Sequence, residues 1–343
     1  MGMLVDGRWS NDDRIIVDGK YVRNKSAFSG VTDAKTLSAL NTFPQRFWLI
    51  ASASCPWSHR AVMIRALKSL EAHVPMHLAH GDRVEGYAAN GGKKWTVPGT
   101  QTDIEHLHQL YSMHDKNYTG RVTVPVLWDS VEKRIVSNES ADIIEALDHI
   151  HTGTGFDFTL RPEALRDKIE TANDLIYVGL NDAVYRAGFA KKQSAYEEAV
   201  QTVFKTLEAL EKRLASSRFY FENALTETDI RLFPTLIRFD AIYYILFKCC
   251  RQRLIDYPNL WAYARDLYQF KGVAETVDFE TMRRASYRAD TNDETLLIAV
   301  MPHMNWWSDH QRDRLGVVTL PLRDGHSMLL EAQMPDLVSG SVP

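Results

Sequence analysis

The sequence predicts an α/β domain followed by an all-helical domain, and three observations support this fold class. Between about residues 46 and 150, strand-like apolar runs alternate with segments of helical periodicity. From Pro162 to about residue 285, apolar residues recur at helical spacing almost throughout. A Gly- and Thr-rich stretch at 151–157 separates the two patterns and is typical of a linker.

These patterns divide the chain into four expected parts. They are an N-terminal arm at 1–45, an α/β domain at 46–150, a helical domain at 160–287 and a C-terminal extension at 288–343. The arm is polar, and both it and the extension are expected to be irregular. Part of the extension, which ends in Ser-Gly-Ser before its last residues, is expected to be mobile.

Composition limits the classes of partner. The 343 residues are 45% hydrophobic and 24% charged, with a formal net charge of −4, so neither nucleic acid nor an acidic membrane surface is an expected partner. No apolar run is long enough to span a bilayer, and the first residues do not form a secretory signal. Three cysteines are too few for a disulfide framework and fit a reducing compartment, so a cytoplasmic location is expected.

The elements of the α/β domain are expected in the order β-α-β-α-β-β-α. A strand ends near Ala53, a helix covers 60–70, a parallel strand follows at 74–78, a long loop occupies 81–100, and a helix covers 104–118. Because proline is poorly tolerated in a central strand, the next strand is expected to start at Pro125, after a bend at Val124. Residues 134–137 form its hairpin partner, and an amphipathic helix covers 140–150.

The helical domain contains one clear helix start. Thr226 and Asp229 have the spacing of a capping box, with Asp in place of the usual Glu. Pro234 lies inside the helix that follows and is expected to kink it.

A thiol at the first strand-to-helix junction is the strongest chemical signal. Residues 55–60 read Cys-Pro-Trp-Ser-His-Arg directly after the strand. With Cys55 at the N-cap and Pro56 at the first helical position, backbone N–H groups and the helix dipole would stabilise the thiolate form of Cys55. This placement favours a nucleophile over a structural cysteine.

The motif has no second cysteine, because Ser58 stands at its fourth position. An oxidised product at Cys55 must therefore be resolved by an external thiol, and glutathione is the expected partner. Cys249 and Cys250 lie in an apolar segment far along the chain and are expected to be buried packing residues.

Two further segments fit a peptide-like ligand. A bend at Val124, favoured by a cis peptide bond before Pro125, would leave the Val124 N–H and C=O free to pair with an extended ligand. Glu139 and Ser140 stand at an expected helix start, where Ser140 and the N–H groups bind a carboxylate and Glu139 pairs with an ammonium. Taken alone, the two segments also fit an edge proline and an ordinary helix cap.

Together these segments resemble the glutathione transferase superfamily, in which a thioredoxin-like domain precedes a helical domain. Within it the match is to the xi class, the glutathionyl-hydroquinone reductases, and it runs from residue 1 to about 287. The segments that carry the resemblance are 55–60 (Cys-Pro-Trp-Ser-His-Arg), 120–129 (Gly-Arg-Val-Thr-Val-Pro-Val-Leu-Trp-Asp), 136–140 (Val-Ser-Asn-Glu-Ser), 184–190 (Val-Tyr-Arg-Ala-Gly-Phe-Ala) and 225–231 (Leu-Thr-Glu-Thr-Asp-Ile-Arg).

The resemblance implies an activity and a set of site residues. Cys55 would attack the sulfur of a glutathionyl-hydroquinone, and a second glutathione would resolve the resulting mixed disulfide. Tyr185 would reach from the helical domain to the hydroquinone oxygen. The implied glutathione-binding residues are Trp95, Arg121, Val122, Thr123, Val124, Glu139 and Ser140. The implied partners are glutathione and an aromatic, hydroquinone-type thioether, and the implied assembly is a homodimer.

The segment at 282–292 departs from the family pattern. The family's active-site tyrosine aligns with Ser286, Tyr287 follows one position later, and Asp290 replaces a histidine. Tyr287 is therefore the candidate acceptor-side tyrosine, next to an altered acceptor pocket.

Two alternatives to this assignment stay open. An omega-like thioltransferase or deglutathionylase would use the same chemistry on another aromatic substrate. A non-catalytic glutathione-fold module would only bind. No metal site is expected, because His106 and His108 are two positions apart and would face different sides of a helix.

Overall fold

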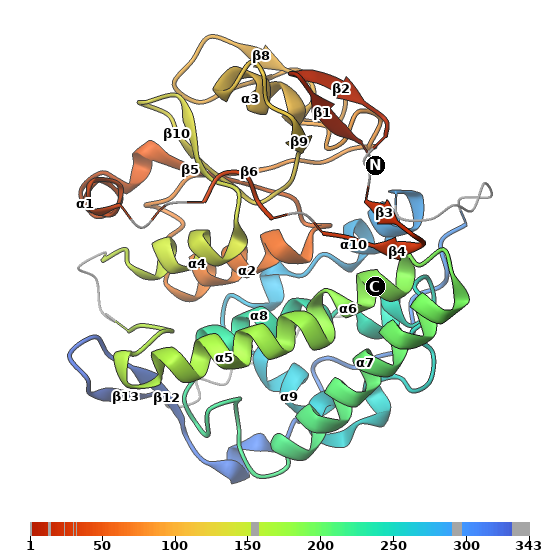
Figure 1. Ribbon diagram of the computed structural model, residues 1–343. Coiled ribbons are helices and arrows are strands. Elements are labelled where there is room, and N and C mark those ends of the chain that lie inside the picture. Colours follow the sequence, from red (N-terminus) through yellow and green to blue (C-terminus); the bar gives the residue numbers. More distant parts are fainter. Residues whose placement is uncertain are drawn as a thin grey trace, which may run out of the picture.

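The computed structural model describes residues 2–12, 15–23, 25–29, 31, 33–151, 158–289 and 297–330. The strands are β1 Met3–Val5, β2 Arg8–Ser10, β3 Ile16–Val17, β4 Lys20–Tyr21, β5 Phe47–Ala51, β6 Met76–Leu78, β7 Trp95–Thr96, β8 Asp103–Ile104, β9 Gly120–Arg121, β10 Val126–Asp129, β11 Arg134–Ser137, β12 Val318–Pro321 and β13 Ser327–Leu330. The α-helices are α1 Ala34–Thr42, α2 Pro56–Leu67, α3 Leu107–His114, α4 Ser140–Asp148, α5 Arg166–Ile176, α6 Ala183–Gly188, α7 Gln193–Arg213, α8 Glu227–Leu236, α9 Pro258–Tyr268 and α10 Phe279–Ala289. The predicted fold class, a thioredoxin-like α/β unit followed by an all-helical unit, is confirmed (Figure 1).

A four-stranded mixed sheet organises the α/β unit. Its strand order is β11-β10-β5-β6, in which β5 and β6 are parallel and the other neighbours are antiparallel. The predicted parallel strand and the predicted hairpin are therefore confirmed. The first strand of the hairpin, β10, begins at Val126 and not at Pro125, directly after the cis Val124-Pro125 bond. The helix expected over 104–118 is shorter and covers only Leu107–His114.

Alternation along the strands separates the two faces of the sheet. Leu49 and Leu127 belong to the core that α2 and α4 complete, whereas Ile50, Val126 and Trp128 belong to a second core with α3. Successive side chains of a strand point to opposite faces, so one buried strand supplies both cores.

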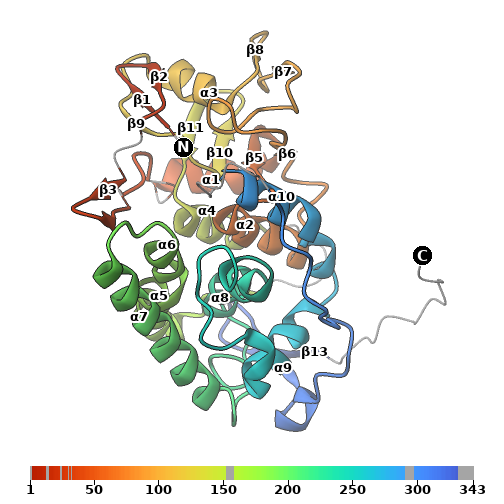
Figure 2. The same ribbon diagram turned by 90° about the vertical axis from the view of Figure 1, so that its right-hand side faces the viewer.

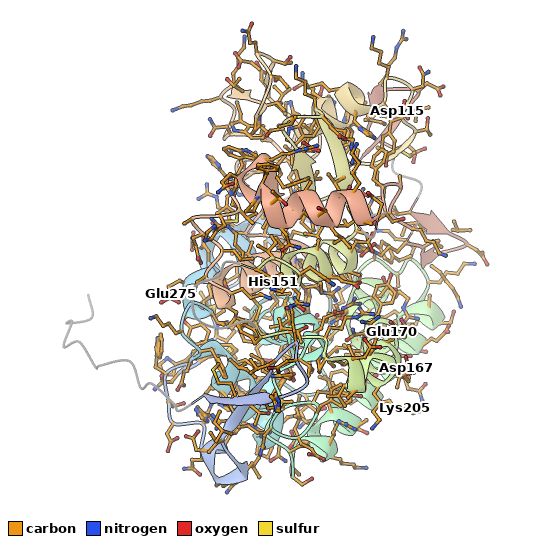
Figure 3. All side chains as sticks on the ribbon, turned by 90° about the vertical axis from the view of Figure 1, so that its left-hand side faces the viewer. Asp115, His151, Asp167, Glu170, Lys205 and Glu275 are labelled. Atoms are coloured by element: carbon orange, nitrogen blue, oxygen red, sulfur yellow. The ribbon has the colours of Figure 1, made fainter. Side chains whose placement is uncertain are left out.

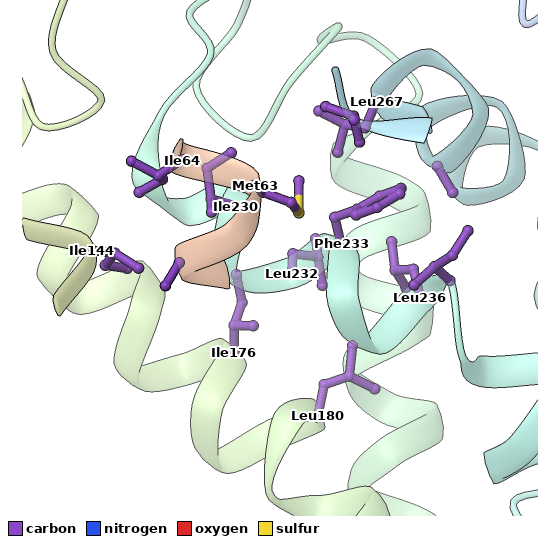
Figure 4. Close-up of a cluster of buried hydrophobic side chains, with 14 of the residues drawn as sticks. Met63, Ile64, Ile144, Ile176, Leu180, Ile230, Leu232, Phe233, Leu236 and Leu267 are labelled. Atoms are coloured by element: carbon purple, nitrogen blue, oxygen red, sulfur yellow. The ribbon is translucent and has the colours of Figure 1, made fainter. Parts of the chain in front are cut away.

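The larger core is shared by the two units. Figure 4 shows Met63 and Ile64 of α2 packed against Ile230 and Phe233 of α8, and all four side chains are fully buried. The N-terminal half of the chain therefore has no closed core of its own on this face of the sheet.

The capping box at the start of α8 is confirmed. The Thr226 N–H donates to the Asp229 carboxylate at 2.9 Å, and Asp229 also accepts from the Tyr263 hydroxyl at 2.7 Å. Pro234 lies inside α8, and a π-helical turn, Phe239–Tyr243, follows soon after the helix ends.

The N-terminal arm is ordered in short elements, and its expected irregularity was wrong. β1 pairs with β2 and with β9, so the first residues extend the α/β unit, and β3 and β4 form a separate hairpin. Hydrophobic side chains along it, such as Leu4 and Tyr21, are buried, which the polar composition of the arm concealed.

The C-terminal extension packs back on the helical unit. β12 and β13 form a hairpin, and Arg312 is buried while it donates to backbone carbonyls at Leu214 and Arg218. The predicted mobile end, together with Asp290, lies outside the described residues. Exposed charged side chains such as Asp167, Glu170, Lys205 and Glu275 project from the surface in Figure 3. In the part of the chain that the structure describes, every helix is too short or too polar to cross a bilayer.

Candidate active site

Cys55 occupies the N-cap of α2, at the carboxyl end of β5. Pro56 is in the first turn of the helix, as predicted. Cys55 is 5% exposed, and its thiol donates to the Val124 carbonyl at 3.3 Å. The expectation that this carbonyl is free was therefore wrong, because the thiol itself uses it.

The thiol opens onto a cavity of about 360 Å³ between the two units. Contributions come from the N-terminal arm, the start of α2, the loop after β6, the segment leading to Pro125, α6 and α10. The lining residues are Gly2, Trp9, Asn11, Tyr21, Arg23, Ser54, Cys55, Pro56, Trp57, Arg83, Val84, Gly86, Tyr87, Arg121, Val122, Thr123, Val124, Tyr185, Phe189 and Arg288.

The cavity brings together six of the ten predicted site residues. These are Cys55, Arg121, Val122, Thr123, Val124 and Tyr185. The other four, Trp95, Glu139, Ser140 and Tyr287, do not line it.

Trp95 does not line the cavity. It lies in β7, which pairs with β8, and its ring stacks on His77 with 3.9 Å between the ring centroids. The aromatic residue that the same long loop supplies to the cavity is Tyr87.

Glu139 and Ser140 lie at the N-terminus of α4, as predicted, one layer behind the cavity wall. The Glu139 carboxylate accepts from the Ala141 N–H at 3.2 Å and caps the helix. The Ser140 hydroxyl accepts from Arg60, whose guanidinium also lies 4.3 Å from the centre of the Trp57 ring. Trp57 is a cavity residue, so this pair is connected to the cavity through two side chains.

Tyr185 and Tyr287 have different surroundings. Tyr185 of α6 lines the cavity, and its hydroxyl lies 3.4 Å from the Tyr243 hydroxyl. Tyr287 of α10 is buried, and its hydroxyl has no hydrogen-bond partner among the described residues. Burial raises the pKa of Tyr287, although Arg283 partly opposes this. The residue of α10 that reaches the cavity is Arg288, one position beyond the tyrosine.

A buried polar network fixes the start of α2 to the helical unit. Arg238 donates to His59 Nδ1 at 2.9 Å, and His59 Nε2 lies 2.8 Å from the Thr276 hydroxyl. Because arginine only donates, Nδ1 must be the acceptor and Nε2 carries the proton. Burial, with a smaller contribution from the charge of Arg238, holds the pKa of His59 well below its usual value. Arg238 also donates to the Ala53 carbonyl, so it supports the turn that presents Cys55.

One group of side chains has the composition of a metal site. The ligand atoms of Glu85, His106 and His108 all lie within 4.8 Å of one another, and His108 is 2.9 Å from Glu85. The expectation that the two histidines face different sides of a helix was wrong, because His106 is the extended N-cap of α3. Two imidazoles and a carboxylate are suited to a divalent transition metal such as zinc.

The other two cysteines differ from each other. Cys249 is fully buried, as expected, and burial raises its pKa to about 12. Cys250 is exposed, so its expected burial was wrong. Cys55 is thus the one of the three that lines the cavity.

The sequence patterns did not point to several of the cavity residues. Arg83 and Tyr87 follow β6, and because β5 and β6 are parallel, their carboxyl ends share one edge of the sheet. That rule would have placed the loop beside Cys55. Trp9 and Arg23 carried no comparable signal, because nothing in the sequence showed where the arm packs.

Comparison with known proteins is consistent with this architecture. The family model for the glutathione S-transferase N-terminal domain matches residues 54–150, and that for the C-terminal domain matches residues 193–266. The fold, with a cysteine at the α2 N-cap and a cavity between the two units, defines a protein of the glutathione transferase type.

The relatives identify the class within that type. Glutathionyl-hydroquinone reductase YqjG from Escherichia coli is 40% identical over 334 residues, covering 91% of this chain and 99% of the relative. Glutathionyl-hydroquinone reductase PcpF from Sphingobium chlorophenolicum is 40% identical and covers 84% of this chain and 91% of the relative. Among solved structures, a xi class transferase from Natrialba magadii has a TM-score of 0.77 at 33% identity, covering 92% of this chain and 97% of that one. Glutathione-bound YqjG has a TM-score of 0.74 at 41% identity, covering 78% and 88%. The chain therefore belongs to the glutathione transferase superfamily, and within it to the xi class.

Proposed function

We propose that this protein is a glutathione-dependent reductase that removes glutathione from glutathionyl-hydroquinones. The observation that carries the proposal is that Cys55, a thiol at a helix N-cap, and Tyr185, a phenol, line the same cavity. The names of the relatives YqjG and PcpF support the same reaction.

In the first step, the Cys55 thiolate attacks the sulfur of the thioether. The carbon–sulfur bond breaks, its electron pair stays on the ring carbon, and that carbon takes up a proton to give the free hydroquinone. A disulfide between Cys55 and glutathione remains. The sulfur that begins this step lies at the N-terminus of α2.

In the second step, the thiolate of another glutathione attacks the mixed disulfide. Oxidised glutathione leaves, and the Cys55 thiolate is restored. The net reaction consumes one glutathione, whose proton replaces the thioether sulfur on the ring. An external thiol is needed because Ser58, at the fourth position of the motif, cannot close a disulfide.

Tyr185 is the proposed proton donor on the acceptor side. Its hydroxyl comes from the helical unit, opposite the thiol, and a neighbouring phenol, Tyr243, lies within 3.4 Å of it. A hydrogen bond to a hydroquinone oxygen would help the ring accept the electron pair of the broken bond. Tyr287 is not part of this proposal, because its side chain does not line the cavity.

The proposed glutathione site runs along residues 121–124 towards the start of α4. The Val124 N–H has no hydrogen-bond partner among the described residues, which suits the pairing of an extended peptide. Arg121 supplies a cation for a carboxylate. Glu139 and Ser140, which the resemblance implies for the γ-glutamyl end, do not line the cavity and are connected to it through Arg60 and Trp57.

The first test is Cys55→Ser, assayed with glutathionyl-menadiol or a chlorinated glutathionyl-hydroquinone plus glutathione. Hydroquinone release is expected to stop, since a serine hydroxyl is a poor nucleophile at neutral pH. Both the parent protein and the variant should carry Cys250→Ser, so that the exposed thiol does not form a competing mixed disulfide. Cys249→Ser in the same background is the matched control and should keep activity. Full activity of Cys55→Ser would show that Cys55 is not the nucleophile.

The second test is Tyr185→Phe. Loss of the hydroxyl is expected to lower kcat by about 10²-fold, the lower range for one positioned acid–base group, with little change in the rate at which Cys55 is alkylated. An unchanged kcat would mean that Tyr185 is not the donor.

An omega-like thioltransferase is the second candidate. It is favoured by one observation: on α10, Arg288 lines the cavity and the tyrosine does not. A relative named glutathione S-transferase omega-like 2, from Schizosaccharomyces pombe, is 36% identical and covers 78% of this chain. A small mixed disulfide such as that of glutathione with hydroxyethanethiol separates the candidates, since a thioltransferase should turn it over faster than the quinol thioether.

A homodimer in the cytoplasm completes the proposal. Sedimentation of the purified chain tests the assembly, and a monomer at assay concentrations would rule out a dimer requirement for the reaction.

A further inference from the structure

The cavity wall is strongly cationic. Among the residues that the structure describes, its lining includes four arginines, Arg23, Arg83, Arg121 and Arg288, and no aspartate or glutamate. They come from four separate segments: the N-terminal arm, the loop after β6, β9 and α10. The fold therefore collects positive charge in a space of about 360 Å³.

Glutathione does not account for this charge. The tripeptide has two carboxylates and one ammonium, so at most two of the four guanidinium groups can each pair with a carboxylate. Arg121 and Arg23 lie on the side of Val124 and Trp57, where the proposed function places glutathione; the Arg23 guanidinium is 4.2 Å from the centre of the Trp57 ring. Arg83 and Arg288 line the same cavity from the loop after β6 and from α10, where the other half of the substrate would lie.

Arg83 is held in position beside the thiol. Its NH2 group donates to the Ser54 hydroxyl at 3.0 Å and to the Tyr87 hydroxyl at 3.2 Å. The guanidinium also lies 4.3 Å from the centre of the Tyr87 ring. Ser54 directly precedes Cys55, so the charge of Arg83 is fixed within one residue of the nucleophile.

Arg288 approaches from the helical unit. In Figure 2, α10 lies between the α/β unit above it and α9 below it, and the Arg288 guanidinium is 3.3 Å from Asp82, the neighbour of Arg83. The Asp82 side chain is 78% exposed, and an exposed ion pair of this kind contributes little. An anionic ligand inside the cavity can therefore compete with Asp82 for Arg288.

The same wall offers flat aromatic surface. Trp9, Tyr87, Tyr185 and Phe189 line the cavity together with the two arginines. Aromatic rings and a pair of guanidinium groups are together complementary to a planar ring that bears an anionic group. We propose, resting on the proposed function, that the aromatic half of the thioether substrate carries an anionic substituent such as a carboxylate, and that Arg83 and Arg288 bind it.

The test compares two glutathione thioethers that differ in one group: that of hydroquinone and that of gentisate, the hydroquinone with a ring carboxylate. The readout is the ratio of their kcat/KM values, which cancels any loss common to both. The parent protein should prefer the gentisate conjugate by ~10-fold or more, as one charge-assisted contact provides. The preference should shrink as salt is raised.

The variants Arg83→Met and Arg288→Met should each move the ratio towards one, and Arg288→Lys should keep part of the preference. Arg284→Met is the matched control, because Arg284 is on the same helix, is exposed and does not line the cavity. It should leave the ratio unchanged.

Two failures are distinguishable. If Cys55 turns over both conjugates with equal kcat/KM, or if the preference survives in both methionine variants, the inference is wrong while the proposed function stands. If neither conjugate is turned over, the proposed function fails and this inference fails with it.

Discussion

Protonation of His59 should couple the stability of the protein to pH. The folded protein holds this imidazole neutral, because burial and the adjacent Arg238 keep its pKa well below 6.5. In the unfolded chain the imidazole has its ordinary pKa and takes up a proton below about pH 6.5. The unfolded state then binds more protons than the folded state, so stability falls as pH falls through this range.

The size of the effect follows from one proton. With an unfolded pKa of about 6.5 and a folded imidazole that stays neutral, the free energy of unfolding should drop by up to about 1.3 kcal/mol between about pH 7.0 and 5.5. The variant His59→Asn should lack this part of the drop. Its amide oxygen can accept from Arg238 in place of Nδ1, and it has no proton to titrate.

The assay is urea unfolding at both pH values, with the slope against denaturant checked to be constant. His303→Asn is the control, since His303 is exposed and its change should leave the pH dependence as in the parent protein. If His59→Asn loses as much stability on acidification as the parent, then His59 is not the coupled group and the assigned tautomer is wrong.

Three further changes test the packing around the site. Asp229→Ala should lower the free energy of unfolding by about 3 kcal/mol or more, because it leaves the buried Tyr263 hydroxyl and two backbone N–H groups unpaired. Adding Tyr263→Phe should recover part of that loss, as measured in a double-mutant cycle. Gly99→Ala should cost more than about 1 kcal/mol by thermal unfolding, since φ is +78° and the new Cβ would lie 1.8 Å from the Ser130 carbonyl oxygen, and an unchanged melting temperature would contradict this. Arg312→Met should speed proteolysis of the C-terminal extension, because Arg312 bonds it to backbone carbonyls that follow α7; equal rates would mean that the hairpin β12–β13 holds the segment alone.

The sheet was predictable because its signals are local. Alternation and β-branched runs marked β5, β10 and β11, and the rule against proline in a central strand located the bend at Val124. The capping box at Thr226 was readable for the same reason, since its two partners are three residues apart. The arm was not predictable, because β1 pairs with β9 across more than a hundred residues.

The site was predictable only in part for a related reason. Cys55 and the segment 121–124 sit at strand ends, whose position in the sheet follows from the strand order. Trp95 and Tyr287 were misplaced because a motif places a residue to within one or two positions, whereas the direction of a side chain depends on the local pairing. On α10, one position separates the buried Tyr287 from Arg288 on the cavity.

The core shared by α2 and α8 has a consequence for how this chain can be divided. Met63, Ile64, Ile230 and Phe233 are all fully buried, and each covers apolar surface of the other unit. A polypeptide cut between residues 151 and 158 would expose both halves of that contact to water. The two halves therefore differ in architecture but are not independently folding domains. Neither half alone should form the surface on which Cys55 acts, and the two halves should unfold together as one cooperative unit.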